Sequence, residues 1–202
     1  KDGDGDGYGG TISTKSCKSK TGYVSNNADC DDTNAAIHPS ATEVCNGYDD
    51  DCDTYIDDAD SSLDTSSATT WYLDSDGDGY GGTTSAMECT PSAGYVAKTS
   101  DCDDTNAAVN PSATEVCNGI DDDCDTLTDD KDSSLDKSTA TTWHKDADSD
   151  GYGGSTTAVQ CVADAGYIAD GSDCDDGNAA VNPGASEICN GIDDDCDTLI
   201  DM

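Results

Sequence analysis

Positive charge is scarce in this chain of 202 residues. It has 8 lysine and arginine residues against 45 aspartate and glutamate residues, which gives a formal net charge of −37. A nucleic-acid partner is excluded, because phosphate binding requires a positive surface. The sign of the charge also argues against binding to anionic membranes, and no apolar run approaches the ~18 residues of a membrane span.

Large apolar side chains are scarce as well. Phenylalanine is absent, and aromatic residues make up 5% of the chain. This composition is typical of disordered proteins, because burial of so little apolar surface cannot offset the conformational entropy lost on folding. A chain of this kind folds only with additional stabilisation from disulfides, metal ions or stacking between neighbouring units.

The chain consists of tandem repeats. The stretch DSDGDGYGG at residues 74–82 recurs as DGDGDGYGG at 2–10 and as DADSDGYGG at 146–154. The tyrosines of the three copies are evenly spaced, because the step from Tyr8 to Tyr80 equals the step from Tyr80 to Tyr152. A constant period indicates a repeat array. We expect repeats at 1–72, 73–144 and 145–202, the last one truncated, with Ser/Thr-rich connectors at 61–70 and 133–142.

The cysteines keep the same period as the tyrosines. They form four sets: Cys17, Cys89 and Cys161; Cys30, Cys102 and Cys174; Cys45, Cys117 and Cys189; Cys52, Cys124 and Cys196. Disulfides in an oxidising, extracellular setting are the favoured interpretation. A zinc site is the alternative, but zinc motifs use closer cysteine pairs and usually histidine. Four cysteines allow three pairings, of which local pairing, Cys17–Cys30 and Cys45–Cys52, is the simplest. We expect two disulfides in each repeat and none between repeats.

Three acidic loops in each repeat have the residue types of calcium sites. In the first loop, aspartates stand at positions 1, 3 and 5, glycine follows at position 6, and the backbone carbonyl of tyrosine is available at position 7. Position 12 lacks the usual glutamate, so a closing ligand must come from elsewhere in the repeat or from water. The predicted ligands are Asp2, Asp4, Asp6 and Tyr8; Asp74, Asp76, Asp78 and Tyr80; Asp146, Asp148, Asp150 and Tyr152.

The second loop reads DCDDTN or DCDDGN and is followed by a glutamate. Its predicted ligands are Asp29, Asp31, Asn34 and Glu43; Asp101, Asp103, Asn106 and Glu115; Asp173, Asp175, Asn178 and Glu187. For the glutamates, a bidentate ligand and a solvated residue at a helix start are equally compatible with the sequence. The third loop places aspartates at positions 1, 3, 5 and 9, with threonine in place of glycine at position 6. Its predicted ligands are Asp49, Asp51, Asp53 and Asp57; Asp121, Asp123, Asp125 and Asp129; Asp193, Asp195, Asp197 and Asp201.

The spacing of these aspartates points to a bound cation. Solubility alone does not require aspartate at alternate positions followed by glycine, three times over. Ligands that are all oxygen select a hard cation, and close carboxylates at flexible spacing favour Ca²⁺ over Mg²⁺. The sequence therefore predicts three or more calcium ions in each repeat.

Residues 70–125, with the motifs TWYLDSDGDGYGG, DCDDTNAAVNPSATEVCNG and IDDDCD, resemble a known family. It is the tandem metal-binding repeat of large bacterial secreted and surface proteins, named after a methanotroph copper-binding surface protein. The acidic loops with embedded cysteines are also similar to thrombospondin type 3 repeats, in which calcium ions and disulfides replace a core. The resemblance covers nearly the whole chain and implies an extracellular, calcium-type repeat. Copper prefers histidine, methionine or free thiolate, which are few here, so copper binding is not expected to carry over.

The expected fold class is mostly irregular: tandem repeats stabilised by calcium and disulfides, with short β-strands and single helical turns, forming an elongated rod. The runs 69–74 and 94–97 are β-prone, and 105–109 suits one helical turn before Pro111. The Ser/Thr-rich connectors at 61–70 and 133–142 are expected to be polar linkers.

Two functions are compatible with the sequence, and neither is enzymatic, since no Ser/His/Asp set or phosphate-binding loop is present. The favoured one is a calcium-stiffened extracellular rod that belongs to a filament or surface fibre. The alternative is a stalk or ligand-binding segment of a surface adhesin, whose cell-surface or matrix ligand the sequence does not identify. The near-identity of the repeats favours the structural function, because binding modules diverge at their contact loops. Repeats contact mainly their neighbours, so we expect head-to-tail self-association into filaments.

Overall fold

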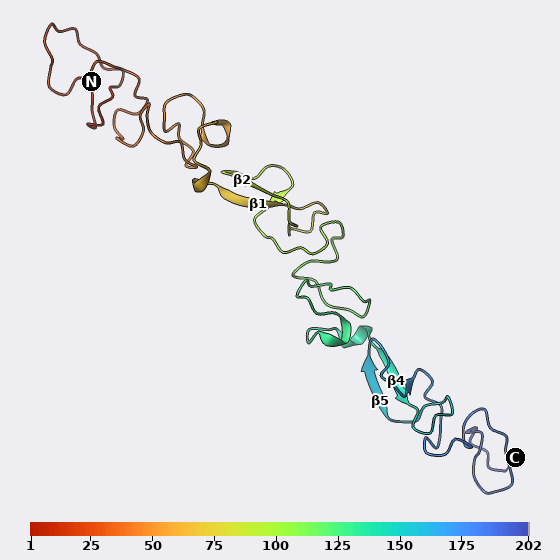
Figure 1. Cartoon of the computed structure of the whole chain (residues 1–202). Helices are drawn as coiled ribbons and strands as arrows, with labels where there is room; N and C mark the ends of the chain where they lie inside the picture. The colour runs from red at the N-terminus through yellow and green to blue at the C-terminus, as the bar shows by residue number, and fades with distance from the viewer. Residues whose placement is uncertain (202) are drawn as a thin grey trace. The chain divides into compact units, whose positions relative to one another are not determined.

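The computed structural model describes residues 1–201 and contains little regular secondary structure (Figure 1). The chain divides into two compact units, one from Lys1 to Thr105 and one that starts at Asn106. The first unit contains the 3₁₀ turns η1 (Asp57–Ala59) and η2 (Thr65–Ser67) and the strands β1 (Thr69–Leu73), β2 (Ser85–Glu88) and β3 (Tyr95–Val96). The second unit repeats this order with η3 (Asp129–Lys131), η4 (Lys137–Thr139), β4 (Thr141–Lys145), β5 (Thr157–Gln160) and β6 (Tyr167–Ile168).

Each unit has one small antiparallel sheet whose central strand comes first in sequence. The strand orders are β2-β1-β3 and β5-β4-β6. Strand β1 has the sequence TTWYL, which is rich in the β-branched and aromatic residues that favour strands. Its register pairs Thr69 with Glu88 and Tyr72 with both Ser85 and Val96. The indole Nε1 of Trp71 donates to the carbonyl oxygen of Glu88 at 3.0 Å, which secures this register.

The predicted strands at 69–74 and 94–97 are present as β1 and β3. The predicted helical turn at 105–109 is wrong: Val109 N donates to Asn106 O at 2.8 Å in a turn, and no helix forms there. The 3₁₀ turns lie instead in and beside the segments expected to be connectors. Asp64 opens η2 by accepting from Ser66 N at 2.9 Å, so a side-chain cap starts this turn.

The connector segments fold against the loops that precede them. Asp64 N donates to Glu43 O, and Asp136 N donates to Glu115 O, both at 2.9 Å. Leu135, in the second connector, is one of the buried apolar side chains. These segments are therefore ordered parts of the repeat.

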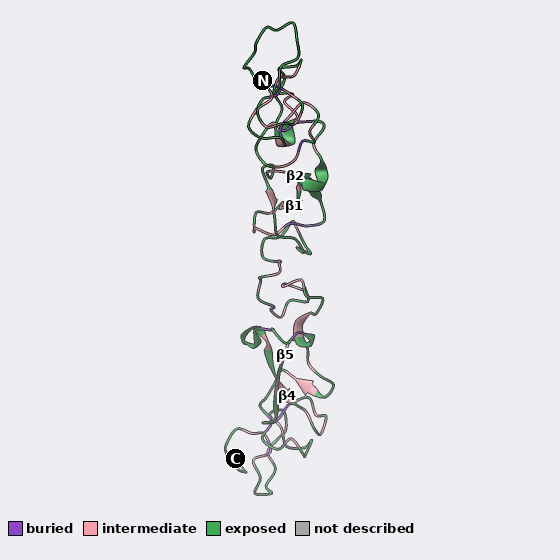
Figure 2. Cartoon of the chain, turned by 90° about the vertical axis from the view of Figure 1, so that its left-hand side faces the viewer, coloured by how far each residue is buried: buried purple, intermediate pink, exposed green. Residues whose placement is uncertain are grey.

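The buried side chains are acidic more often than apolar. Among the described residues, the buried hydrophobic side chains are Ile37, Val109, Leu135 and Val181. The buried charged side chains are more numerous: Asp29, Glu43, Asp50, Asp60, Asp101, Glu115, Asp122, Asp132, Asp173 and Asp194. Most of the chain is exposed or half-buried (Figure 2). Hydrophobic burial is therefore too small to hold these units together by itself.

Disulfides supply part of the missing stability, and their pairing differs from the predicted one. Cys30 bonds to Cys52, and Cys174 bonds to Cys196. Cys45 bonds to Cys89, and Cys117 bonds to Cys161, each across a sequence separation of 44 residues. Cys102 and Cys124 are also disulfide-bonded, which brings the number of disulfides to five.

The predicted pairs Cys17–Cys30 and Cys45–Cys52 are wrong, as is the expectation that no disulfide joins two repeats. Cys45 lies in the first repeat and Cys89 in the second, so their bond joins the two. The physical reason is that β2 pairs antiparallel with β1 and returns the chain to the connector, which folds beside Cys45 through the bond from Cys45 N to Ser67 Oγ. This path places Cys89, directly after β2, within 5.2 Å of Cys45, measured between Cα atoms. Cys17 and Cys189 are free and exposed.

Candidate metal centres

The first acidic loop and the start of the second loop together form a cluster of carboxylates, which we call site A. Its members are Asp4, Asp6 and Asp29 in the first repeat, Asp76, Asp78 and Asp101 in the second, and Asp148, Asp150 and Asp173 in the third. In every copy, the Oδ2 atoms of all three aspartates are shielded from solvent and have no hydrogen-bond partner. Buried carboxylate oxygens without partners are costly, so this arrangement fits a cation that has three negative oxygens as ligands.

The electrostatics of site A lead to the same conclusion. Burial raises the pKa of Asp101, and the negative charges of Asp78 and Asp76 raise it further. A backbone hydrogen bond from Asp103 N, at 2.9 Å, opposes this change. The pKa values of Asp29 and Asp173 are raised by the same causes. The free site thus disfavours its own ionised form, and a bound divalent cation would remove this penalty.

A hydrogen bond between loops holds the two parts of site A together. In the second repeat, the carboxylate of Asp104 accepts from Ser75 N at 2.9 Å and from Ser75 Oγ at 2.6 Å. These bonds lower the pKa of Asp104 and keep it ionised. Asp32 accepts from Gly3 N, and Asp176 accepts from Ala147 N, in the same way. Site A therefore depends on a contact between segments that are 29 residues apart.

Two glycines of the YGG motif permit this contact. A Cβ atom on Gly82 would lie 2.9 Å from Asp104 Cβ, and one on Gly81 would lie 2.5 Å from Tyr72 Cβ. Neither glycine has a positive φ angle, so backbone conformation does not explain them. They are needed because neighbouring atoms leave no room for a Cβ atom. Gly79, at position 6 of the loop, has φ +95 and is needed for its backbone conformation.

A second cluster, which we call site B, combines residues from three segments. Carboxylate oxygens of Glu43, Asp51 and Asp60 lie within 4.8 Å of one another. Asp60 Oδ2 is buried and has no hydrogen-bond partner. The corresponding residues of the second repeat are Glu115, Asp123 and Asp132, where Asp123 Oδ1 and Asp132 Oδ2 are also buried without a partner.

The glutamate of site B is completely buried. Glu43 and Glu115 both have 0% exposure, so a solvated residue at a helix start, one of the two interpretations of the sequence, is wrong for them. Glu43 accepts from Asp50 N and from Asp57 N, both at 2.8 Å. It therefore ties the two ends of the third loop together, and its carboxylate also faces the other members of site B.

The third loop itself forms a further cluster, site C, which shares Asp51 with site B. Carboxylate oxygens of Asp49, Asp51 and Asp53 lie within 4.8 Å of one another. Thr54, at position 6, adopts φ +82 although it is β-branched, and Thr54 N donates to Asp49 Oδ2 at 2.9 Å. Threonine is strongly disfavoured in this conformation. Strain of this kind persists only where the surrounding contacts impose it, and it is concentrated at functional sites.

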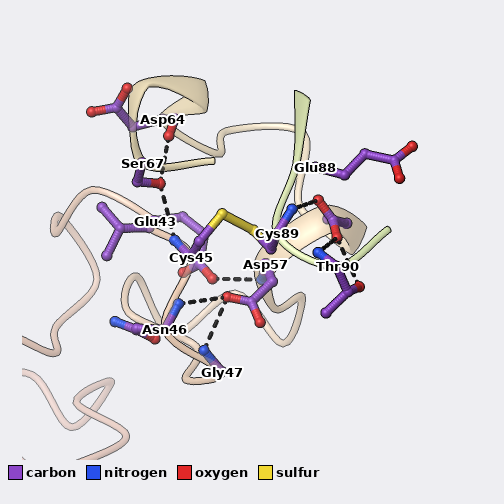
Figure 3. Close-up of a disulfide and its surroundings, with 12 residues drawn as sticks. Glu43, Cys45, Asn46, Gly47, Asp57, Asp64, Ser67, Glu88, Cys89 and Thr90 are labelled. Carbon is purple, nitrogen blue, oxygen red and sulfur yellow. Dashed lines mark hydrogen bonds between the residues drawn. A yellow bond between two sulfur atoms is a disulfide. The ribbon is translucent and has the colours of Figure 1, made fainter. Parts of the chain in front are cut away.

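Other predicted ligands take part in hydrogen bonds around these clusters. Asp57 Oδ1 accepts from Asn46 N and Gly47 N, at 2.9 and 3.0 Å, beside the Cys45–Cys89 disulfide (Figure 3). Asp129 and Asp201 make the equivalent bonds. Asp2, grouped with Asp4 and Asp6, accepts from Gly5 N.

The predicted ligands of the second loop divide between two environments. Asp29 enters site A, as described. Asp31 Oδ1 accepts from Thr33 Oγ1 at 2.6 Å, and Asn34 Oδ1 accepts from Ala36 N at 3.3 Å. These two side chains shape the turn that follows the loop.

Sequence reasoning missed Asp60 and Asp132, the third members of site B. Each lies directly before one of the predicted connectors, 61–70 and 133–142, where a polar residue is expected in any case. The available signal was the repeat period, which Asp60 and Asp132 keep. The aspartates that brace site A, Asp32, Asp104 and Asp176, keep it too.

Comparison with known proteins identifies the acidic segments. Residues 29–58, 101–130 and 173–201 match the family described as "Putative metal-binding motif". Each match starts at the aspartate that the second loop contributes to site A and runs through the third loop. No curated protein and no solved structure matches the chain. Among the described residues, no helix is long and apolar enough to cross a membrane.

Proposed function

The chain carries three tandem copies of this metal-binding motif, and we propose that it is an extracellular, non-catalytic structural protein whose repeats are held folded by calcium ions. The observation that carries the proposal is the set of buried carboxylate oxygens without partners in sites A and B. Four buried apolar side chains cannot replace the free energy that cations would contribute there. When a site is absent from the unfolded chain, metal binding contributes directly to the free energy of folding.

The chemistry of the donors supports calcium over copper. Sites A, B and C present carboxylate oxygens, which are ligands for hard cations. The ring of His38 stacks on Tyr8, with ring centroids 5.1 Å apart, and His144 Nδ1 contacts Gly154 O. Ten of the cysteines are disulfide-bonded and cannot act as thiolate ligands. When bound, calcium would neutralise the mutual repulsion of the aspartates in each site.

The disulfides support an extracellular location and a mechanical role. Disulfides persist in oxidising compartments. The Cys45–Cys89 and Cys117–Cys161 bonds covalently connect one repeat to the next. Such a chain resists extension even where its hydrophobic core is small, which suits a filament or surface fibre.

Chelation tests the proposal. The full chain, with disulfides intact, is incubated in warm EDTA long enough for slow release and is then returned to Ca²⁺, Mg²⁺ or Cu²⁺. We expect a large loss of thermal stability in EDTA, followed by recovery in Ca²⁺ that exceeds recovery in Mg²⁺ or Cu²⁺. A melting temperature that EDTA leaves unchanged would contradict the proposal.

Electron microscopy of the calcium-loaded protein at high concentration tests whether it forms filaments. A compact monodisperse particle would argue for the adhesin stalk.

A further inference from the structure

An Asn-Gly dipeptide stands directly before the third loop of every repeat. The three pairs are Asn46–Gly47, Asn118–Gly119 and Asn190–Gly191, and the sequence contains no other Asn-Gly pair. All six residues are exposed. Asparagine followed by glycine is the dipeptide most prone to deamidation, because glycine has no side chain to hinder the reaction. The chain therefore places a chemically labile bond beside each group of metal ligands.

Deamidation has requirements that a fold can control. The backbone nitrogen of glycine loses its proton and attacks Cγ of asparagine, so that an N–Cγ bond forms and the Cγ–Nδ2 bond breaks. The departing Nδ2 takes up a proton and leaves as ammonia. Water then opens the cyclic imide to aspartate or isoaspartate. A hydrogen bond that holds the glycine N–H, or one that holds the asparagine amide in place, opposes the first step.

The attacking nitrogen is held in the folded repeat. Gly119 N donates to Asp129 Oδ1 at 3.0 Å. Figure 3 shows the equivalent bond of the first repeat, from Gly47 N to Asp57, also at 3.0 Å. The third repeat has the same bond. The nitrogen must leave this carboxylate before it can attack.

The asparagine side chain is held as well. Asn118 Nδ2 donates to both carboxylate oxygens of Asp122, at 2.9 and 3.0 Å, and Asn118 Oδ1 accepts from Ile120 N at 2.7 Å. Asp122 is buried, so it holds the amide from the interior of the repeat. The same three bonds recur around Asn46 and Asn190.

Glu115 connects both of these aspartates to site B. It accepts from Asp122 N at 2.8 Å and from Asp129 N at 2.7 Å. Glu115 is also a member of site B, where Asp123 and Asp132 have buried oxygens without a partner. The glutamate of the first repeat makes the equivalent bonds. A cation in site B would therefore stabilise the closed loop that holds the Asn-Gly pair, and without it the carboxylates repel one another and favour opening.

We propose that Asn46 and Asn118, in the two repeats for which site B has been described, are deamidation sites that bound calcium protects. Loss of the ion opens the third loop and frees the glycine nitrogen, and deamidation then proceeds as in an unfolded Asn-Gly pair. The inference rests on the proposed function, to which it adds an irreversible chemical consequence of calcium loss.

The product would prevent the repeat from closing again. Aspartate in place of Asn118 puts a second carboxylate where Nδ2 now lies 2.9 Å from Asp122 Oδ1, and it removes both hydrogen bonds from Nδ2. Like charges at this distance repel strongly beside a buried group. Isoaspartate in addition lengthens the backbone by one carbon atom. A deamidated repeat should therefore fail to regain its stability when calcium is restored.

The rate of deamidation tests the protection. The full chain, with disulfides intact, is incubated at mildly alkaline pH in calcium, in EDTA, and in EDTA with urea. Pepsin digestion in acid stops the reaction, and mass spectrometry gives the deamidated fraction at Asn46 and Asn118. In calcium, both rates should be at least about tenfold lower than in urea, because the reaction follows the population of the opened loop. In EDTA, they should approach the urea rate.

A variant of site B links the protection to the metal. Asp132→Asn removes a predicted ligand that is not among the residues that hold the Asn-Gly pair. In limiting calcium, it should speed deamidation of Asn118, whereas Asn46 of the same molecule keeps the rate of the unmodified chain. Asp136→Asn is the control, because it removes the same charge from an exposed cap and should change neither rate.

Asn118→Asp tests the consequence of deamidation. We expect a lower urea midpoint for the second unit in calcium. Asn106→Asp is the matched control, because Asn106 Oδ1 accepts from Ala108 N at 3.3 Å and aspartate offers the same acceptor. Equal midpoints of the two variants would contradict the inferred irreversibility.

Two results would overturn the inference and leave the proposed function standing. One is equal deamidation in calcium and in urea. The other is slow deamidation in EDTA by a chain whose melting temperature EDTA has lowered. An unchanged Asn118 rate in Asp132→Asn would overturn the role of site B. A melting temperature that EDTA leaves unchanged would instead refute the proposed function, and the inference with it.

Discussion

At the scale of single residues, the unusual feature is the burial of carboxylates. Asp101 is 7% exposed and Glu115 is 0% exposed in a chain whose net charge is already strongly negative. Glu115 is satisfied by two backbone N–H groups. Asp101 has one oxygen without any partner. The burial of Asp101 therefore requires a cation, whereas that of Glu115 is already offset by hydrogen bonds from the backbone, although its carboxylate also belongs to site B.

Asp101→Asn should weaken calcium binding at site A of the second repeat. The amide keeps the shape of the side chain and can still accept from Asp103 N, but it removes one of three negative ligands. We expect at least a tenfold loss of affinity for one class of sites, measured by calorimetric titration of the chelated protein. Asp136→Asn is the control, because it removes the same charge from an exposed cap where asparagine also serves. Equal effects of the two variants would contradict the assignment of site A.

The stability of the chain should respond to pH in opposite directions with and without calcium. The pKa values of Asp29, Asp101 and Asp173 are raised on folding. Without metal, the folded state therefore binds more protons than the unfolded state at pH values just above the ordinary aspartate pKa, about 4. Its stability then falls as pH rises through the raised pKa values. Calcium requires the ionised carboxylates, so its contribution grows over the same window.

The measurement is the melting temperature between pH 7 and about 4.5, in EDTA and in calcium. Lowering the pH should raise it in EDTA and lower it in calcium, so that the two curves converge. The aspartates whose pKa is lowered, such as Asp58 and Asp104, lose their contribution only below this window. Parallel curves would show that site A does not couple protons to calcium.

At the scale of elements, the loops take the place that helices and strands hold in most proteins. Sites A and B are built where separate segments meet: the first loop with the second in site A, and the third loop with Glu43 and Asp60 in site B. The strands are short, and their part is to return the chain so that loops distant in sequence meet. Close approach of backbones, made possible by glycine, decides whether the loops fit.

Gly82→Ala should disrupt the contact between the first and second loops. The new methyl group would lie 2.9 Å from Asp104 Cβ, so one loop must shift. We expect a loss of about 1–3 kcal/mol in the free energy of unfolding, together with weaker calcium binding at site A. Gly177→Ala is the matched control, since its nearest atom would lie at an ordinary 3.7 Å. Chemical denaturation in calcium compares the two, and similar midpoints would refute the close-contact argument.

At the scale of the whole molecule, the disulfides decide how repeats are joined. The bonds across 44 residues connect the segment directly before the third loop to the segment after the next first loop. A repeat of this type is therefore not covalently self-contained. Its connector and central strand are enclosed in a loop that begins in one repeat and closes in the next.

Replacement of both Cys45 and Cys89 by serine should destabilise the first unit strongly. In the chain-entropy model, a loop of this length contributes about 4 kcal/mol. We expect a separate, earlier unfolding transition in urea, followed by tryptophan fluorescence, since Trp71 lies inside the loop. Cys17→Ser is the control, because Cys17 is free and exposed. A single unchanged transition in the double variant would show that the bond contributes little.

The sequence by itself determined the repeats, the metal-binding chemistry and two of the strands. A constant repeat period and alternate aspartates followed by glycine are local patterns, and local spacing is enough to predict them. The β-branched and aromatic residues of 69–73 likewise predicted β1, whereas the mixed composition of 85–88 did not predict β2.

Only the tertiary structure decided which carboxylates share a site and which cysteines bond. Asp60 joins Glu43 because the connector folds against the preceding loops, and Cys89 joins Cys45 because β2 pairs antiparallel with β1 and returns the chain to the connector. Both depend on contacts between distant residues, such as Asp64 N with Glu43 O, which no local pattern encodes. The simplest pairing of cysteines failed for the same reason. Which carboxylates and which cysteines lie close together depends on how the loops pack. The number of residues between them in the sequence does not predict it.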